Sequence, residues 1–128
     1  IFFNDQIFDA YVFACEIIQR ASSSIILIDN YIDETTLVQL SKRKKGVTVI
    51  IYTTRPTAQF KLDIEKHNQQ YQPIQVKTID HVHDRFLIID NKELYHIGAS
   101  LKDLGKKWFA FSKMDKNSVG SIMNKISL

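Results

Sequence analysis

The sequence contains few of the residues that cross-link a chain or divide it into domains. Cys15 is the only cysteine among 128 residues, so no internal disulfide and no CxxC metal or redox motif can form. There are two prolines and four glycines, with no Pro/Gly linker, low-complexity tract or internal repeat. The sequence therefore predicts a single domain over residues 1–128, and the lone cysteine is typical of a cytoplasmic protein.

Long apolar runs are also missing. No run approaches the roughly eighteen residues that a membrane helix requires, and the opening IFFNDQIFDAYVF lacks the basic flank of a signal peptide. We therefore expect no membrane partner. Because the chain begins with Ile1 instead of Met, we expect it to be a fragment of a longer protein in which a neighbouring domain carries part of the function.

The overall composition is that of an ordinary globular protein. Hydrophobic residues make up 45% of the chain and charged residues 24%. Seventeen Lys and Arg against fourteen Asp and Glu give a net charge of +3, a mild bias toward anionic partners that does not by itself select a function.

The hydrophobic pattern predicts helices alternating with buried strands. In the first half, apolar residues at helical spacing and continuous β-branched runs predict helices over about 5–20, 33–45 and 57–69 and strands at 25–28 and 47–53. In the second half, we expect strands at 74–79, 85–89, 93–97 and 108–112, followed by a helix from about 115. This order predicts an α/β fold with a mixed, largely parallel sheet flanked by helices on both faces.

The stretch HVHDRFLIIDNKELYHIGAS, residues 81–100, carries the candidate chemistry. Side chains alternate along a strand, so we expect His83 and Arg85 to point to the same side and to form one polar patch. The apolar run that follows would hold both groups on a rigid support. A bend at Gly98 would bring the hydroxyl of Ser100 to the same place.

An imidazole, a guanidinium and a hydroxyl together suit an anionic tetrahedral group. Arginine binds phosphate oxygens bidentately, and serine adds a hydrogen bond. A neutral histidine beside them can attack phosphorus and hold a covalent phosphoryl intermediate. The pattern therefore predicts a phosphodiester site.

At these residues the sequence resembles the phospholipase D-like superfamily, whose motif is His-x-Lys, four residues, Asp, six residues, Gly-Ser-x-Asn. His83, Arg85 and Asp90 match its first three positions in spacing. The resemblance implies three catalytic residues: His83 is the nucleophile, Arg85 binds phosphate and Asp90 supports the motif. It also implies that the reaction needs no metal ion or other cofactor. Ser100 and Lys102 fall near the Gly-Ser-x-Asn element and are expected to bind phosphate.

The sequence departs from that motif in ways that favour binding over catalysis. Arg85 replaces the lysine, the Gly-Ser element reads Gly98-Ala99-Ser100, and no glutamate follows Glu93, although many members use a later glutamate to orient the nucleophile. Arginine and lysine are not interchangeable where close geometry sets the chemistry. The alternative to a phosphodiesterase or nuclease is therefore a catalytically inactive dimerisation or effector-sensing module of a DNA-binding regulator.

The resemblance covers essentially the whole chain. The segments HDRFLIID and HIGASLKDLGKKWFAFSKM are also similar to the carboxy-terminal domain of bacterial proteins that begin with a phage antirepressor-type DNA-binding domain. Because the superfamily builds its site from two motif copies and this chain has one, the resemblance implies a homodimer in which His83 of each chain faces the other. Nucleic acid is the expected further partner, through this domain or through a missing amino-terminal one.

Simpler interpretations remain for the site histidines. His83 and Arg85 are also consistent with a surface patch bonded to Asp80 or Asp84. His81 alternates with His83, but two histidines without a clear third ligand make a poor metal site.

The basic and aromatic clusters have two interpretations each. The cations of 42–45 suit either the solvated end of a helix or a nucleic-acid contact, while Lys106 and Lys107 are candidates for guiding a polyanion. The aromatic residues of 108–111 suit a core strand or a stacking surface. Residues 29–31 suit either a pocket lining or a helix-capping turn.

Overall fold

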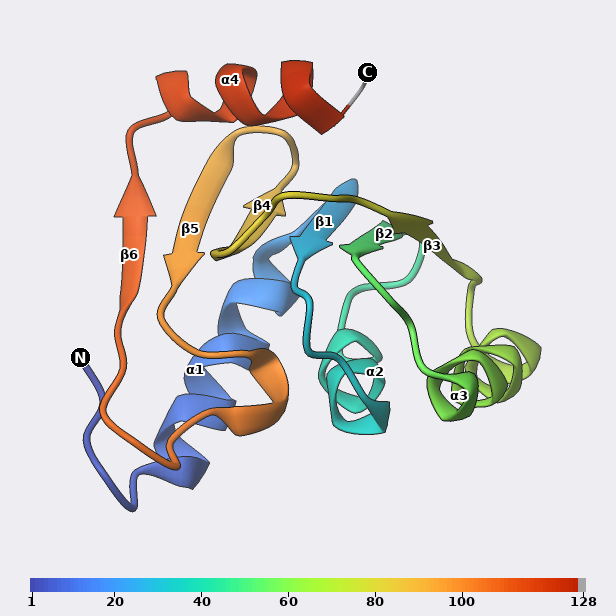
Figure 1. Cartoon of the computed structure of the whole chain (residues 1–128), viewed down its shortest axis with the longest axis horizontal. Helices are drawn as coiled ribbons and strands as arrows, with labels where there is room; N and C mark the ends of the chain where they lie inside the picture. The colour runs from blue at the N-terminus through green and yellow to red at the C-terminus, as the bar shows by residue number, and fades with distance from the viewer. Residues whose placement is uncertain (127–128) are drawn as a thin grey trace.

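A six-stranded β-sheet runs through the middle of the molecule, and helices lie on both of its faces (Figure 1). The computed structural model describes residues 1–126. The strands are β1 Ser24–Ile28, β2 Thr48–Thr53, β3 Ile74–Thr78, β4 Arg85–Ile89, β5 Glu93–Ile97 and β6 Phe111–Met114. The helices are α1 Ile7–Arg20, α2 Glu34–Leu40, α3 Ala58–Gln70 and α4 Asn117–Ile126, with a short 3-10 turn, η1, at Leu101–Asp103.

The sheet is mixed, with the strand order β3-β2-β1-β4-β5-β6. Strands β1, β2 and β3 pair in parallel through crossover helices, whereas β4, β5 and β6 form an antiparallel meander beside β1. As a result β1, β2, β3 and β5 run in one direction and β4 and β6 in the other. This arrangement confirms the fold class expected from the sequence.

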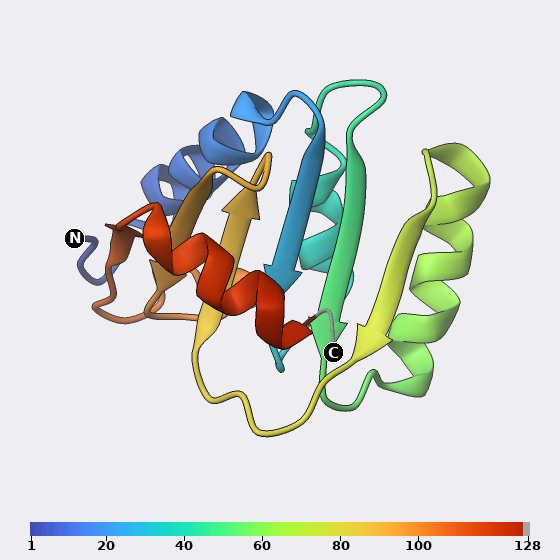
Figure 2. The same cartoon turned by 90° about the horizontal axis from the view of Figure 1, so that it is seen from above.

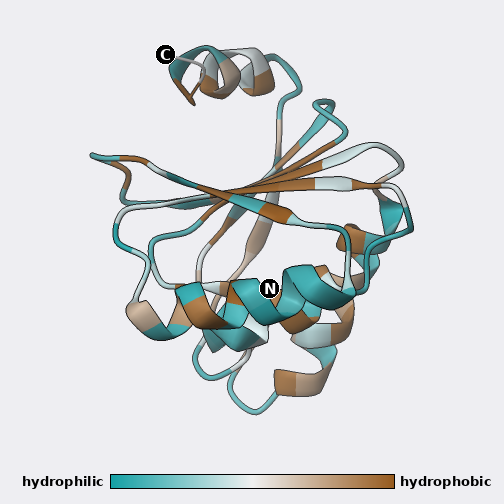
Figure 3. Ribbon diagram, turned by 90° about the vertical axis from the view of Figure 1, so that its right-hand side faces the viewer, coloured by the Kyte–Doolittle hydropathy of each residue, from teal (hydrophilic) through white to brown (hydrophobic). Residues whose placement is uncertain are grey.

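The helices divide unequally between the two faces. Helices α1, α2 and α3 pack on one face over the larger core, and α4 alone crosses the other face (Figures 2 and 3). The continuous apolar run of β4 serves both layers, because Leu87 packs in the larger core and Ile88 in the cluster that contains Val119 of α4. Among residues 1–126, no helix is long and apolar enough to cross a membrane.

Helix α2 ends earlier than the sequence predicts. It stops at Leu40, and the following basic residues form a loop that ends at Gly46, whose φ of +87° is the left-handed conformation that glycine tolerates. The Arg43 guanidinium donates to the Leu40 carbonyl at 2.9 Å and to the Gln72 carbonyl at 2.6 Å. A contact with a distant loop thus replaces the further helical turns expected up to residue 45.

Strand β6 begins later than the sequence predicts, at Phe111 instead of Trp108. The preceding residues pair with the amino-terminal segment: Phe2 and Phe109 exchange two backbone hydrogen bonds of 2.9 and 3.1 Å, and their rings stack at 5.3 Å. Trp108 lies outside the sheet and is 70% exposed. The aromatic run therefore divides between core and surface, which a single strand assignment could not anticipate.

Candidate phosphate-binding site

A hollow of about 420 Å³ lies at the edge of the sheet where β1 and β5 end and β4 begins. We call it the Arg85 hollow. Its lining residues are Arg85, Gly98, Ala99, Ser100, Asp103, Lys106, Lys107 and Trp108. Ligands of open α/β sheets usually bind at this carboxyl edge, and three of the cations proposed from the sequence meet here.

Arg85 is the first residue of β4 and is half-buried. Its guanidinium carbon lies 5.7 Å from the centre of the Tyr31 ring, close enough for a cation–π interaction that orients the planar group. Among residues 1–126, no carboxylate lies within ion-pair distance of Arg85. Arg85 therefore presents an oriented guanidinium without a direct ion pair, although its charge acts on the buried Asp29 carboxyl nearby.

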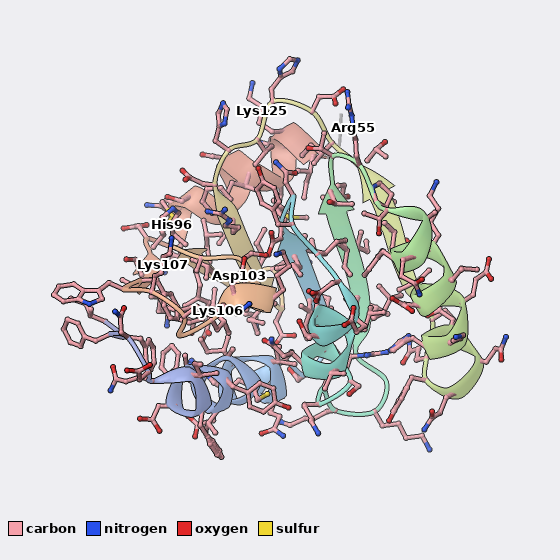
Figure 4. The ribbon with its side chains drawn as sticks, turned by 60° about the horizontal axis from the view of Figure 1, so that its bottom comes forward. Arg55, His96, Asp103, Lys106, Lys107 and Lys125 are labelled. Atoms are coloured by element: carbon pink, nitrogen blue, oxygen red, sulfur yellow. The ribbon has the colours of Figure 1, made fainter. Side chains whose placement is uncertain are left out.

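The loop between η1 and β6 supplies the remaining cations. The Lys106 ammonium lies 3.2 Å from a carboxylate oxygen of Asp103, and Figure 4 shows these two side chains side by side. Lys107 is exposed and forms no ion pair within the described residues. The Trp108 ring meets Phe3 edge-on, with 4.7 Å between ring centres. The loop thus combines positive charge with a supported, exposed aromatic ring.

Gly105 fixes the path of this loop. Its φ is +79°, and a Cβ there would lie 2.8 Å from the backbone nitrogen of Ile7, so only glycine fits without moving α1. The close approach holds Lys106 beside the start of α1. Sequence reasoning missed this role, because the contact joins residues about a hundred positions apart.

Ser100 lines the hollow, but its hydroxyl is directed into the protein. The side chain is 2% exposed, and Oγ lies 2.9 and 3.0 Å from the two carboxylate oxygens of Asp29 and also contacts the Tyr31 carbonyl. Asp29 accepts further bonds from the backbone of Tyr31 and Leu101. Burial raises the pKa of the Asp29 carboxyl above its ordinary value. These hydrogen bonds and the charge of Arg85 lower the pKa, but burial has the larger effect. The hydroxyl therefore ties the end of β5 to the end of β1 and is not free to meet phosphate as the sequence suggested.

Asp90 lies at the opposite end of β4 from Arg85, roughly 17 Å away along a strand of this length. Its carboxylate accepts backbone N–H bonds from Ser22, Ser23 and Ser24 at 3.0, 2.7 and 3.0 Å and bonds from two serine hydroxyls. Asp90 thus fastens β4 to the start of β1, far from the hollow. The structure thus places Asp90, which the sequence groups with His83 and Arg85 as a catalytic residue that supports the motif, at the far end of β4 from Arg85.

His83 lies in the loop before β4, because the strand begins at Arg85. The argument that both side chains share one strand face therefore does not reach His83. The histidine is exposed and is not among the residues that line the Arg85 hollow in the described chain. The loop is anchored next to it, since the Asn30 amide donates to the Val82 carbonyl at 2.6 Å while its oxygen accepts from Thr54.

Lys102 faces a different hollow, between α1 and α2, together with Gln39 and Leu104. Its ammonium lies 3.2 Å from Asp103. The structure therefore separates Lys102 from Arg85 and brings in Lys106 and Lys107 instead. No group of three His, Cys, Asp or Glu in residues 1–126 is arranged to hold a metal ion.

Residues 29–31 form the turn between β1 and Asp33, which caps α2, and none of the three is among the described residues that line the Arg85 hollow. Asp29 organises the turn after β1, Asn30 anchors the loop that carries His83, and Tyr31 flanks Arg85. The sequence signal was their position directly after a buried strand, but it did not assign the separate roles. His96 lies 3.5 Å from Asp84 and meets Phe86 edge-on, on the α4 side of the sheet.

Comparison with known proteins identifies the fold. No family model and no curated protein matches the chain. Among solved structures, NucT from Helicobacter pylori superimposes with a TM-score of 0.66 at 12% identity, over 94% of this chain and 86% of that one. Nuc from Salmonella typhimurium, a phospholipase D family member, gives 0.64 at 17% identity, over 89% and 82%. The chain therefore has the fold seen in NucT and in the phospholipase D family member Nuc.

A third neighbour extends the comparison to a DNA-binding protein. TrmBL2, an archaeal chromatin protein described as having a novel mode of DNA binding, gives a TM-score of 0.60 at 16% identity. The match covers 94% of this chain and 48% of TrmBL2, so the chain spans about half the length of that protein.

Proposed function

We propose that this chain is a phospholipase D-like domain of a bacterial or phage-related DNA-binding protein, and that it recognises nucleic-acid phosphate at the Arg85 hollow. The observation that carries the proposal is the convergence of Arg85, Lys106 and Lys107 on one hollow beside the exposed ring of Trp108. The fold that the chain shares with Nuc and with TrmBL2 supports the same reading.

The arrangement suits a single strand in particular. Cations that neutralise phosphates release condensed counterions, which supplies most of the affinity for a polyanion. A base splayed from a single strand can stack on an exposed aromatic ring, whereas bases inside a duplex are already stacked. Trp108, supported by Phe3 and flanked by Lys107, offers such a ring.

The double substitution Lys106→Gln and Lys107→Gln tests this proposal. We expect it to weaken binding of a short single-stranded DNA by about tenfold at low salt and to reduce the slope of log affinity against log salt by about 1.4, or about 0.7 for each charge removed. Fluorescence anisotropy of a labelled oligonucleotide, titrated at several salt concentrations, measures both quantities.

The matched control is Lys61→Gln with Lys66→Gln, which removes the same charge from the exposed side of α3. We expect the control to bind as the unaltered protein does, apart from a small general effect of net charge. Equal losses in the two double variants would contradict a localised site and would leave only non-specific attraction.

Cleavage of phosphodiesters by His83 is a second candidate function. It is favoured by one observation: His83 is exposed in a loop whose backbone Asn30 anchors, two residues before Arg85. In this proposal two copies of the chain meet about a two-fold axis, and one His83 attacks phosphorus while the other protonates the leaving oxygen. The buried hydroxyl of Ser100 and the displaced Lys102 make this site less complete than the binding site.

Incubation with DNA and with a chromogenic phosphodiester, in EDTA, separates cleavage from binding alone. If His83 is a nucleophile, cleavage persists in EDTA and falls at least about a thousandfold in His83→Ala, because no other group replaces it. DNA binding by this variant is expected to remain. Absence of turnover in the unaltered protein, or a strictly monomeric state in solution, would reject cleavage. A dimer without turnover would then be the inactive dimerisation or effector-sensing module, and a monomer would be an effector-sensing or binding module alone.

A further inference from the structure

A second hollow, of about 500 Å³, lies at the opposite edge of the sheet. Figure 2 shows the loop from α2 into β2 and the loop from α3 into β3 at the same end of the sheet. Residues of these two loops line the hollow, so it lies at the amino ends of the parallel strands. We call it the amino-edge hollow. Its lining residues are Ser41, Arg43, Lys44, Lys45, Gly46, Gln70, Tyr71 and Gln72. The Arg85 hollow lies at the other end of the strands, beside β4 and β5.

The charge of the amino-edge hollow has one sign. Arg43, Lys44 and Lys45 all line it, and no aspartate or glutamate does. None of the ion pairs found among residues 1–126 involves these three cations. Three like charges without acidic neighbours repel one another, so an anion that binds among them relieves that repulsion.

Arg43 is held in place by groups that do not cancel its charge. Two of its N–H groups donate to the carbonyls of Leu40 and Gln72, which join the two loops. Burial lowers the pKa of the Arg43 guanidinium, in line with a cation placed where water solvates it poorly. A fixed, poorly solvated cation with remaining N–H donors is well prepared to bind phosphate oxygens.

An aromatic ring adjoins these cations. Tyr71 lines the hollow, is 43% exposed and stacks on His67 with 5.2 Å between ring centres and 22° between planes. The His67 ring is itself fixed by a 2.8 Å contact between Nδ1 and the Asn68 side-chain oxygen. His67 therefore supports one face of the Tyr71 ring, and the partly exposed ring offers a surface on which a planar group can stack. The side chains of Gln70 and Gln72 add amide donors and acceptors at the same place.

We infer that the amino-edge hollow binds a phosphate-bearing nucleoside, with the phosphate among Arg43, Lys44 and Lys45 and the base against Tyr71. The volume lies within the usual range for small-ligand pockets, about 300–1,000 Å³. The ligand is either a free nucleotide or a nucleotide within a nucleic-acid strand, since both offer this chemistry. The inference does not depend on the proposed function, because the two hollows share no residue.

Calorimetric titration of the whole chain with adenosine 5′-monophosphate, inorganic phosphate and adenosine tests the inference. We expect the nucleotide to bind with a dissociation constant of about 0.1–1 mM and more tightly than either fragment. Lys44→Gln with Lys45→Gln should weaken nucleotide binding by at least about fivefold, because two of three cations are lost. Tyr71→Leu should weaken binding of the nucleotide but not of inorganic phosphate, because it removes only the stacking surface.

The control is again Lys61→Gln with Lys66→Gln, which should leave nucleotide binding unchanged. The inference is overturned if the nucleotide fails to bind at about 5 mM, if both double variants lose affinity equally, or if phosphate alone binds as tightly as the nucleotide. Competition by a short single-stranded DNA in the Lys106→Gln, Lys107→Gln background then identifies the source. Displacement of the nucleotide indicates a strand as ligand, and its absence indicates a free nucleotide.

Discussion

Asp90→Ala lowers the free energy of unfolding by about 3 kcal/mol, although the residue lies far from both hollows. The carboxylate is the shared acceptor for three consecutive backbone N–H groups, those of Ser22, Ser23 and Ser24. Removing it leaves these donors without their partner at the start of β1. Alanine also fits poorly at this position, because the φ of Asp90 is +55°. Urea denaturation measures the loss.

Two variants identify the cause of that loss. Asp90→Asn tolerates the backbone conformation and keeps one acceptor oxygen, so we expect it to lose about half as much stability as Asp90→Ala. Asp80→Ala removes the same charge from an exposed loop position and should change stability by less than about 0.5 kcal/mol. A loss in Asp90→Ala no larger than in Asp80→Ala would contradict the role assigned to the carboxylate.

The contribution of Asp90 depends on pH. Burial raises the pKa of this carboxyl, but the hydrogen bonds from the backbone of Ser23, Ser22 and Ser24 outweigh burial and hold the pKa well below its usual range. The folded state therefore binds this proton less readily than the unfolded state. The stabilisation is complete above the unfolded pKa of about 4 and is lost as pH falls below it. The stability difference between the unaltered protein and Asp90→Asn should accordingly narrow from pH 5 toward about pH 2.

The strands were predictable because a buried strand needs a short run of apolar residues, which can be recognised in the sequence itself. The runs 85–89 and 93–97 match β4 and β5 in both bounds, since each is an apolar segment closed by polar turn residues. The layered α/β architecture follows from their alternation with amphipathic helices. The prediction made helix α2 too long, because the basic residues that follow it have good helical propensity. In the structure Arg43 bonds to the loop beyond α3, and the helix ends before it.

The site was predictable only where a strand positions it. Arg85 lies where the pattern predicts, because it is the first residue of β4. His83 lies before the strand, so the alternation of side chains along β4 does not determine its direction. The positions of Lys106 and Lys107 depend on the contact of Gly105 with Ile7, which no local pattern reveals. Spacing along the chain therefore suggested Lys102 for the phosphate site and named Lys106 and Lys107 only as candidates for guiding a polyanion, whereas the loop brings Lys106 and Lys107 to the hollow.

Arg85→Gln weakens binding of single-stranded DNA by about tenfold or more, which is the value of one charge-assisted, bidentate contact. Arg85 differs from the flanking lysines because the Tyr31 ring orients its guanidinium and β4 fixes its backbone. Little entropy is then lost when it binds phosphate, so it should contribute more than either exposed lysine. Anisotropy titrations at several salt concentrations measure the loss, and urea denaturation confirms that the variant folds.

Arg85→Lys separates the charge of this residue from its geometry. Lysine keeps the positive charge but cannot bind two phosphate oxygens in one plane. We therefore expect Arg85→Lys to keep the salt dependence of the unaltered protein while losing part of its affinity, and Arg85→Gln to lose about 0.7 from the slope as well. An unchanged slope in Arg85→Gln would mean that this guanidinium does not touch phosphate, and the proposal would then rest on the lysine loop alone. A larger loss in Arg85→Lys than in Arg85→Gln would instead indicate that Arg85 acts mainly by packing against Tyr31.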